Sequence, residues 1–113
     1  MRPGSLHPDD PCWEAFVAAM LPLGPVQERR SRYGDKPALV LDRREIAHLE
    51  APGVIDLRIT SAGWSQARDR YADDPGVRRD PSRRDWLELV VRSAADMPRL
   101  TDLLTLAVDA NLH

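Results

Sequence analysis

The sequence contains a single cysteine, Cys12, and has no apolar run near the roughly 20 residues of a bilayer-spanning helix. One cysteine cannot form an internal disulfide, so the chain is not a disulfide-stapled domain. It also lacks a dinucleotide fingerprint, a phosphate-binding loop and a Gly-x-Ser-x-Gly motif. The first residues have no continuous apolar core of the signal-peptide type, so we expect no membrane association and a cytoplasmic location.

Neither sign of charge dominates the 113 residues, because 16 basic and 18 acidic side chains give a formal net charge of −2. A global positive field is therefore absent, and a nucleic-acid partner is not expected. Histidine is scarce: His7 and His113 lie in the end segments and His48 stands alone. This spacing predicts no metal site, and no sequence feature implies a cofactor. Apolar residues (42%) and charged residues (30%) are balanced as in an ordinary globular domain.

The pattern of apolar residues and breakers predicts a flexible N-terminal arm over residues 1–9 and a single α+β domain over residues 10–113. Helices are expected from Asp10, Ser61 and Asp96, each of which is placed as a capping residue. Strands are expected over 37–42, 45–50, 54–60 and 86–92, with 26–33 as an exposed or edge strand and the stretch before Trp86 as a loop. The order α-β-β-β-α-β-α predicts a mainly antiparallel sheet of about four strands with helices packed on one face.

The best-defined segment is a β-hairpin from Glu45 to Arg58, in which Ala51-Pro52-Gly53 forms the turn and Arg43-Arg44 leads in. A three-residue loop places three pairs opposite each other: Glu50 with Val54, His48 with Asp56, and Ile46 with Arg58.

The two faces of this hairpin differ in character. The apolar set faces the helices and consists of Ala47, Leu49, Ile55 and Leu57. The polar set, centred on His48, faces solvent, a cleft or a partner. We also expect Leu39, Leu41 and Ile46 on the His48 face, which would make that face mixed and partly covered.

These positions give a first hypothesis, a small-molecule-binding or oxygenase-like domain. A carboxylate opposite an imidazole orients the ring for proton transfer, so His48 and Asp56 are the candidate catalytic residues. Basic groups nearby can hold an anionic group of the ligand. The candidate ligand-binding residues are Arg44, Glu45, Arg58 and Trp86.

Two other interpretations stand beside this one. Cross-strand His–Asp and Glu–Arg pairs are ordinary on solvated sheet faces, where each contributes less than about 1 kcal/mol. The second functional hypothesis is a non-catalytic module that binds protein or nucleic acid through the arginines before Trp86, which are Arg78, Arg79, Arg83 and Arg84. Their alternation with Asp80 and Asp85 is also typical of a solvated loop. The sequence leaves open whether the protein is an enzyme and whether it forms a homodimer.

The segment Arg43-Arg-Glu-Ile-Ala-His48-Leu-Glu50, followed by Gly53-Val-Ile-Asp56-Leu-Arg58, resembles the luciferase-domain family. This family comprises small bacterial proteins, mostly uncharacterised, and its domain also occurs in the fungal luciferase. That enzyme oxidises a hydroxylated pyrone with molecular oxygen, without a bound metal or flavin. The resemblance runs from about Trp13 to Asn111 and implies a histidine-lined small-molecule pocket, without implying light emission.

The chain departs from this family before Trp86, where many members carry a histidine and this sequence has Val77-Arg-Arg-Asp-Pro-Ser-Arg-Arg-Asp85. Chemistry that needs a histidine pair would be lost here. The segment Ser82-Arg-Arg-Asp-Trp86 is also similar to YjbR-like proteins, whose suspected nucleic-acid role rests on analogy of fold.

Overall fold

The computed structural model of the chain describes residues 10–112, so the arm predicted over residues 1–9 lies outside the described part. The α-helices are α1 (Pro11–Met20), α2 (Thr60–Tyr71) and α3 (Thr101–Leu112), and the 3-10 turns are η1 (Leu21–Leu23), η2 (Ala94–Asp96) and η3 (Pro98–Leu100). The strands are β1 (Val26–Arg30), β2 (Pro37–Leu41), β3 (Arg44–Ala51), β4 (Val54–Arg58), β5 (Val77–Arg79) and β6 (Trp86–Val90). None of the described helices combines the length and the apolar character needed to cross a bilayer.

The strands form one sheet in the order β1-β2-β3-β4-β6-β5, and every neighbouring pair is antiparallel. The α+β class is confirmed, but the sheet has six strands where about four were predicted. The predicted order α-β-β-β-α-β-α lacks the two edge strands, β1 and β5, although β1 lies within residues 26–33, which were expected as an exposed or edge strand. The polar residues of β1 show no clean alternation, and β5 is only three residues long, which is too short for a period-two pattern.

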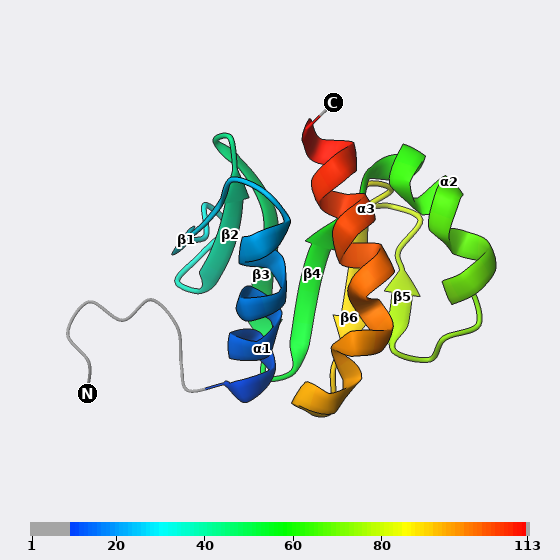
Figure 1. Cartoon of the computed structure of the whole chain (residues 1–113), viewed down its shortest axis with the longest axis horizontal. Coiled ribbons are helices and arrows are strands. Elements are labelled where there is room, and N and C mark those ends of the chain that lie inside the picture. The colour runs from blue at the N-terminus through cyan, green and yellow to red at the C-terminus, as the bar shows by residue number, and fades with distance from the viewer. Residues whose placement is uncertain (1–9, 113) are drawn as a thin grey trace.

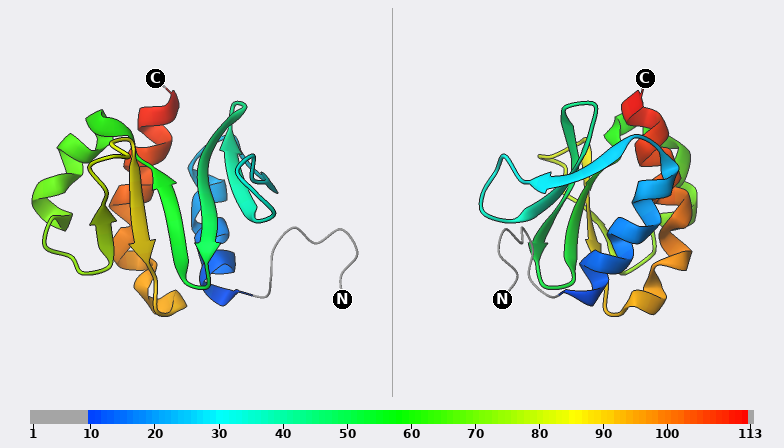
Figure 2. Two further views of the ribbon diagram at one scale, coloured as in Figure 1. Left: turned by 180° about the vertical axis from the view of Figure 1, so that it is seen from behind. Right: turned by 60° about the vertical axis from the view of Figure 1, so that its left-hand side comes forward.

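The three α-helices cover one face of the sheet and leave the other face open, as the two sides of the molecule in Figures 1 and 2 show. The first helix begins as predicted, because the carboxylate of Asp10 accepts the backbone N–H of Trp13. The predicted apolar stripe of α3 is buried against the sheet. However, α3 begins at Thr101, because Ser93 and Asp96 form a capping box on the short turn η2 instead.

One turn and the start of one helix are each displaced by one residue from their predicted positions. The connection between β2 and β3 is Asp42-Arg43, where residues 43–44 were predicted, and its two residues have φ angles of 49° and 71°. The helix α2 begins at Thr60, whose hydroxyl accepts a backbone N–H three residues later, where Ser61 was predicted as the cap.

A bulge in β3 separates its core residues from its open-face residues. Leu39 of β2 pairs with Ala47, but the next residue, Val40, pairs with Glu45. Ile46 is therefore the additional residue of the bulge. The shift turns both Ile46 and Ala47 into the core. Leu39 and Leu41 belong to the same core, so the prediction that they and Ile46 share the His48 face is wrong. Ile46 therefore does not oppose Arg58 either, because the β3–β4 ladder begins with Ala47 and Leu57.

Candidate functional site

His48 lies near the middle of β3 on the open face of the sheet, and only 3% of its surface is exposed. Its Nδ1 is 2.9 Å from Oε2 of Glu45. Its Nε2 is 2.9 Å from Oδ2 of Asp56 and 3.1 Å from Oε2 of Glu50. One imidazole ring therefore meets three carboxylates, with at least one at each nitrogen.

Glu45 is buried beneath the ring because of the first bulge in β3. Residues 46–47 both face the core, so Glu45 and His48 emerge on the same side of the strand although they are three positions apart. The hydroxyl of Ser31 donates to Oε2 of Glu45 at 2.7 Å, and the backbone N–H of Arg32 donates to Oε1 at 2.9 Å. These bonds hold the Glu45 carboxylate against Nδ1 of the ring.

Glu50 reaches the other ring nitrogen because β3 has a second irregularity at its end. Ala51 pairs with Val54, so the predicted pairing of Glu50 with Val54 is wrong and Glu50 is the additional residue of a bulge. Lys36 Nζ, from the single lysine of the sequence, is 2.7 Å from Oε2 of Glu50. Its hydrogen bond is the main reason that the pKa of Glu50 lies below its usual value.

Asp56 stands directly opposite His48, as predicted, and is 2% exposed. Its Oδ2 also lies 3.2 Å from Nη2 of Arg83. Burial alone would raise the pKa of Asp56, but the hydrogen bond and charge of His48, together with Arg83, hold it below its usual value. Within residues 10–112, the buried Oδ1 of Asp56 has no hydrogen-bond partner.

The surroundings of His48 restrict what its ring can do. An ionised carboxylate only accepts hydrogen bonds, so a ring nitrogen that bonds to one has to be the donor. A nitrogen that donates has no free lone pair, so base chemistry at Nε2 requires that something displaces the carboxylates from it.

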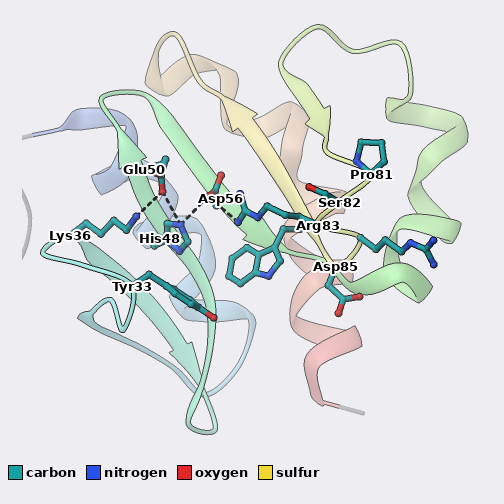
Figure 3. A pocket seen from close by; sticks show the side chains of 11 residues that line it. Tyr33, Lys36, His48, Glu50, Asp56, Pro81, Ser82, Arg83 and Asp85 are labelled. Atoms are coloured by element: carbon teal, nitrogen blue, oxygen red, sulfur yellow. Dashed lines mark hydrogen bonds and ion pairs between the residues drawn. The ribbon is translucent and has the colours of Figure 1, made fainter.

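A hollow of about 650 Å³ opens above this cluster, and Figure 3 shows its side chains. Its floor includes His48, and two partly exposed aromatic side chains line it from either side. The ring centroid of His48 is 5.3 Å from that of Trp86 and 5.8 Å from that of Tyr33. The lining residues are Tyr33, Lys36, His48, Glu50, Asp56, Pro81, Ser82, Arg83, Arg84, Asp85 and Trp86. We refer to this hollow as the His48 pocket.

Arg44 and Arg58, two of the predicted ligand-binding residues, lie outside the His48 pocket. They line a neighbouring hollow of about 400 Å³, which shares Tyr33 and Trp86 with the pocket. Arg58 donates to the side chain of Asn111 on α3 and lies 3.3 Å from a carboxylate oxygen of Asp85. We call this second space the arginine hollow, because its lining includes Arg32, Arg43, Arg44 and Arg58 against two carboxylates, Asp42 and Glu45.

The arginines of the segment before Trp86 contact the protein itself. Arg78 pairs with Glu88 at 3.6 Å, and Arg79 donates to the carbonyl of Arg84 at 3.0 Å. Arg83 reaches Asp56 and lies over the Trp86 ring. Arg84 is exposed at the rim of the His48 pocket. The predicted loop therefore contains the short strand β5 and then forms one wall of the pocket.

The sequence did not identify Tyr33, Lys36 and Glu50 as site residues. Tyr33 and Lys36 lie on the connection between β1 and β2, which comes alongside His48 only when the sheet forms. Glu50 was correctly assigned to the His48 face, but its contact with His48 depends on a bulge that no residue pattern predicts. The uniqueness of Lys36 was the one available signal, since a lone ε-ammonium among 15 arginines is unusual.

Comparisons with known proteins add no relative, since no protein-family model, curated protein or solved structure matches this chain.

Proposed function

We propose that this protein binds a small molecule with an aromatic body and an anionic group, between the His48 pocket and the arginine hollow. The observation that carries the proposal is the position of Tyr33 and Trp86. Their rings, 6.5 Å apart and edge to face, border both spaces. Aromatic faces of this kind contact a planar ligand with little loss of side-chain entropy.

The charges on the two sides explain the preference for an anionic group. On the His48 side, Lys36 and Arg83 are already paired with carboxylates. On the other side, Arg44 is exposed, and basic residues outnumber acidic ones. We therefore expect a carboxylate or phosphate on the ligand to lie beside Arg44, whose guanidinium group can bind it in a bidentate manner.

The carboxylates around His48 favour binding over catalysis. A ring nitrogen that donates to a carboxylate is not available as the base of an oxidation. The resemblance to the luciferase domain also predicts a pocket on this face, and oxidation of the ligand remains a prediction of that resemblance alone.

The second hypothesis, partner binding through the arginine-rich segment, receives less support from the geometry. Three of its four arginines are engaged within the protein, and Arg83 belongs to the pocket floor through Asp56. Arg84 is the residue that separates the two hypotheses, because it is exposed at the rim. If Arg84→Gln abolishes binding to another macromolecule and leaves small-molecule binding intact, the result would support the second hypothesis over the proposed function.

A thermal-shift screen tests the proposal. Aromatic carboxylates and aryl phosphates should raise the melting temperature, whereas acetate and inorganic phosphate should not, because ligands that bind the native state stabilise it. Tyr33→Ala removes an exposed wall, and Arg44→Gln removes the anion contact, so each should weaken binding by about tenfold. Arg68→Gln, an exposed residue on α2, is the matched control and should bind normally. Stabilisation that survives both pocket variants would contradict the proposal.

A further inference from the structure

Three donor atoms converge at the floor of the His48 pocket. Nε2 of His48, a carboxylate oxygen of Glu50 and one of Asp56 all lie within 4.8 Å of one another. The nitrogen is 2.9 Å and 3.1 Å from the nearest oxygens of the two carboxylates. Adjacent ligands of an octahedral metal are separated by about 3.0 Å when each metal–ligand bond is about 2.1 Å. Nε2 of His48 therefore already has the spacing of an adjacent ligand to each of the two carboxylate oxygens.

We propose that His48, Glu50 and Asp56 form a three-ligand site for a divalent transition-metal ion such as Zn²⁺ or Mn²⁺. One imidazole nitrogen with two carboxylates suits these ions better than Mg²⁺ or Ca²⁺, which prefer oxygen ligands alone. The remaining coordination positions face the pocket, where water or the ligand's own donor atoms can occupy them. The inference deepens the proposed function by placing the cation beside the bound molecule.

Glu45 supports the site from the other side of the ring. A metal-binding histidine usually donates its second N–H to a carboxylate, which fixes the tautomer and the ring orientation. Nδ1 of His48 is 2.9 Å from Glu45, and Glu45 is itself held by Ser31 and by the backbone N–H of Arg32. With a metal on Nε2, the ring keeps only its Nδ1 proton, and every contact of Glu45 stays in place.

A second, independent observation at Asp56 supports a cation site. Its Oδ1 is buried and unpartnered within the described residues, although its Oδ2 contacts two cationic groups. A buried carboxylate oxygen without a partner costs free energy, and this cost persists only where something compensates it. A cation bound beside Oδ2 also attracts Oδ1, and it allows Arg83 or Lys36 to shift toward solvent, since the Arg83 side chain is 45% exposed.

Calorimetric titration of tag-free, chelator-treated protein with Zn²⁺ and with Mn²⁺ tests the site without any organic ligand. We expect one equivalent to bind and Mg²⁺ to bind far more weakly. Glu50→Gln changes a partly exposed ligand without removing a core residue, and it should weaken binding at least tenfold. Glu88→Gln is the matched control, because Glu88 pairs with Asp56 across β4 and β6 but lies outside the cluster, and it should not change the affinity.

Paramagnetic broadening by Mn²⁺ gives a second readout that does not depend on the variants. The Trp86 indole resonance should broaden together with the signals of the ligand residues, because its ring is 5.3 Å from that of His48. Absence of saturable binding, or binding that survives Glu50→Gln, would overturn the metal site. Aromatic ligands that bind equally well in EDTA would leave the proposed function standing without it, whereas metal binding with no aromatic ligand would overturn only the proposed function.

Discussion

At the scale of single residues, the contacts of His48 decide the character of the site. Its ring is buried, and each nitrogen faces at least one carboxylate, so the ring and its acidic neighbours form one electrostatic unit. Buried charges are tolerated only when they are paired and hydrogen-bonded. Removal of one member should therefore affect the folded state as well as binding.

Asp56→Asn tests this coupling through pH, with EDTA present to exclude metal. At pH 7 we expect a loss of about 2–4 kcal/mol in the free energy of unfolding, because the substitution removes a buried partner of His48 and Arg83. The pKa of Asp56 is lower in the native state than in the unfolded chain, where it is about 4. The ionised Asp56 carboxylate therefore stabilises the fold fully above about pH 4. This contribution to the free energy of unfolding is lost as the pH falls through the lower native pKa.

Urea denaturation at pH 7 and at pH 3 measures the free energy of unfolding of the wild type and of Asp56→Asn. The stability difference between wild type and Asp56→Asn should shrink at pH 3, because the wild type alone loses this contribution. An equal difference at the two pH values would mean that the Asp56 carboxylate is not stabilised by its neighbours.

Cys12 allows a separate test at the residue scale, far from the site. Its side chain is buried in α1, its thiol lies 3.4 Å from the carbonyl of Val91, and burial raises its pKa. Only the thiolate reacts, so alkylation by iodoacetamide at pH 8 should be about 100-fold slower in the native protein than in urea. Mass spectrometry gives an unambiguous signal because the chain has one cysteine. Equal rates in both conditions would show that the helix does not bury it.

At the scale of elements, β3 shows what a sequence pattern can and cannot predict. The alternation of residues predicted the hairpin, the pairing of His48 with Asp56 and the apolar helix-facing set, because period two is enforced by burial of one face. The two bulges carry no such signal, since each adds one residue without changing composition. The bulges bring Glu45 and Glu50 to the His48 ring, so the alternation of residues could not predict the cluster of three carboxylates around it.

The three-residue strand β5 and the non-local wall of the pocket could not be predicted for a similar reason. Tyr33 and Trp86 are far apart in the sequence and meet only through the order β1-β2-β3-β4-β6-β5. Local periodicity contains no information on that order.

The turn before β3 gives a prediction of stability. Arg43 has a φ of 71°, a left-handed conformation that costs a residue with a Cβ about 1 kcal/mol relative to glycine. Arg43→Gly should therefore stabilise the fold by about 0.5–1 kcal/mol and raise the melting temperature by roughly 2–5 °C. Gly53→Ala in the other turn should do the opposite, because its φ is 72° and a Cβ there would lie 2.7 Å from the carbonyl oxygen of Val91. Calorimetry of both variants checks the pair, and destabilisation by Arg43→Gly would contradict the turn geometry.

At the scale of the whole molecule, the three α-helices cover one face of the sheet (Figure 2). The His48 pocket opens on the other face, with the arginine hollow next to it. The edges of the sheet are β1 and β5, which are short and rich in arginine. Charged, short edges disfavour strand pairing between molecules. The exposed large apolar residues of the described part, Leu21, Tyr33 and Leu112, come from separate elements.

We therefore predict a monomer in place of the homodimer that the sequence left open. Light scattering coupled to size-exclusion chromatography should give the mass of one chain across micromolar concentrations. A stable dimer would show that a surface other than these edges mediates association.

The central claim is that the space beside Tyr33, His48 and Trp86 binds a small aromatic anion, and ligand mapping by NMR tests it most directly. We predict that titration with indole-3-acetate moves the Trp86 indole signal and the backbone amides of residues 33–36 and 83–86 in a saturable way. A different hollow, near Asp74 and Arg99 between α2 and β6, provides the contrast. Shifts confined to that hollow, or no saturable shifts anywhere, would contradict the claim.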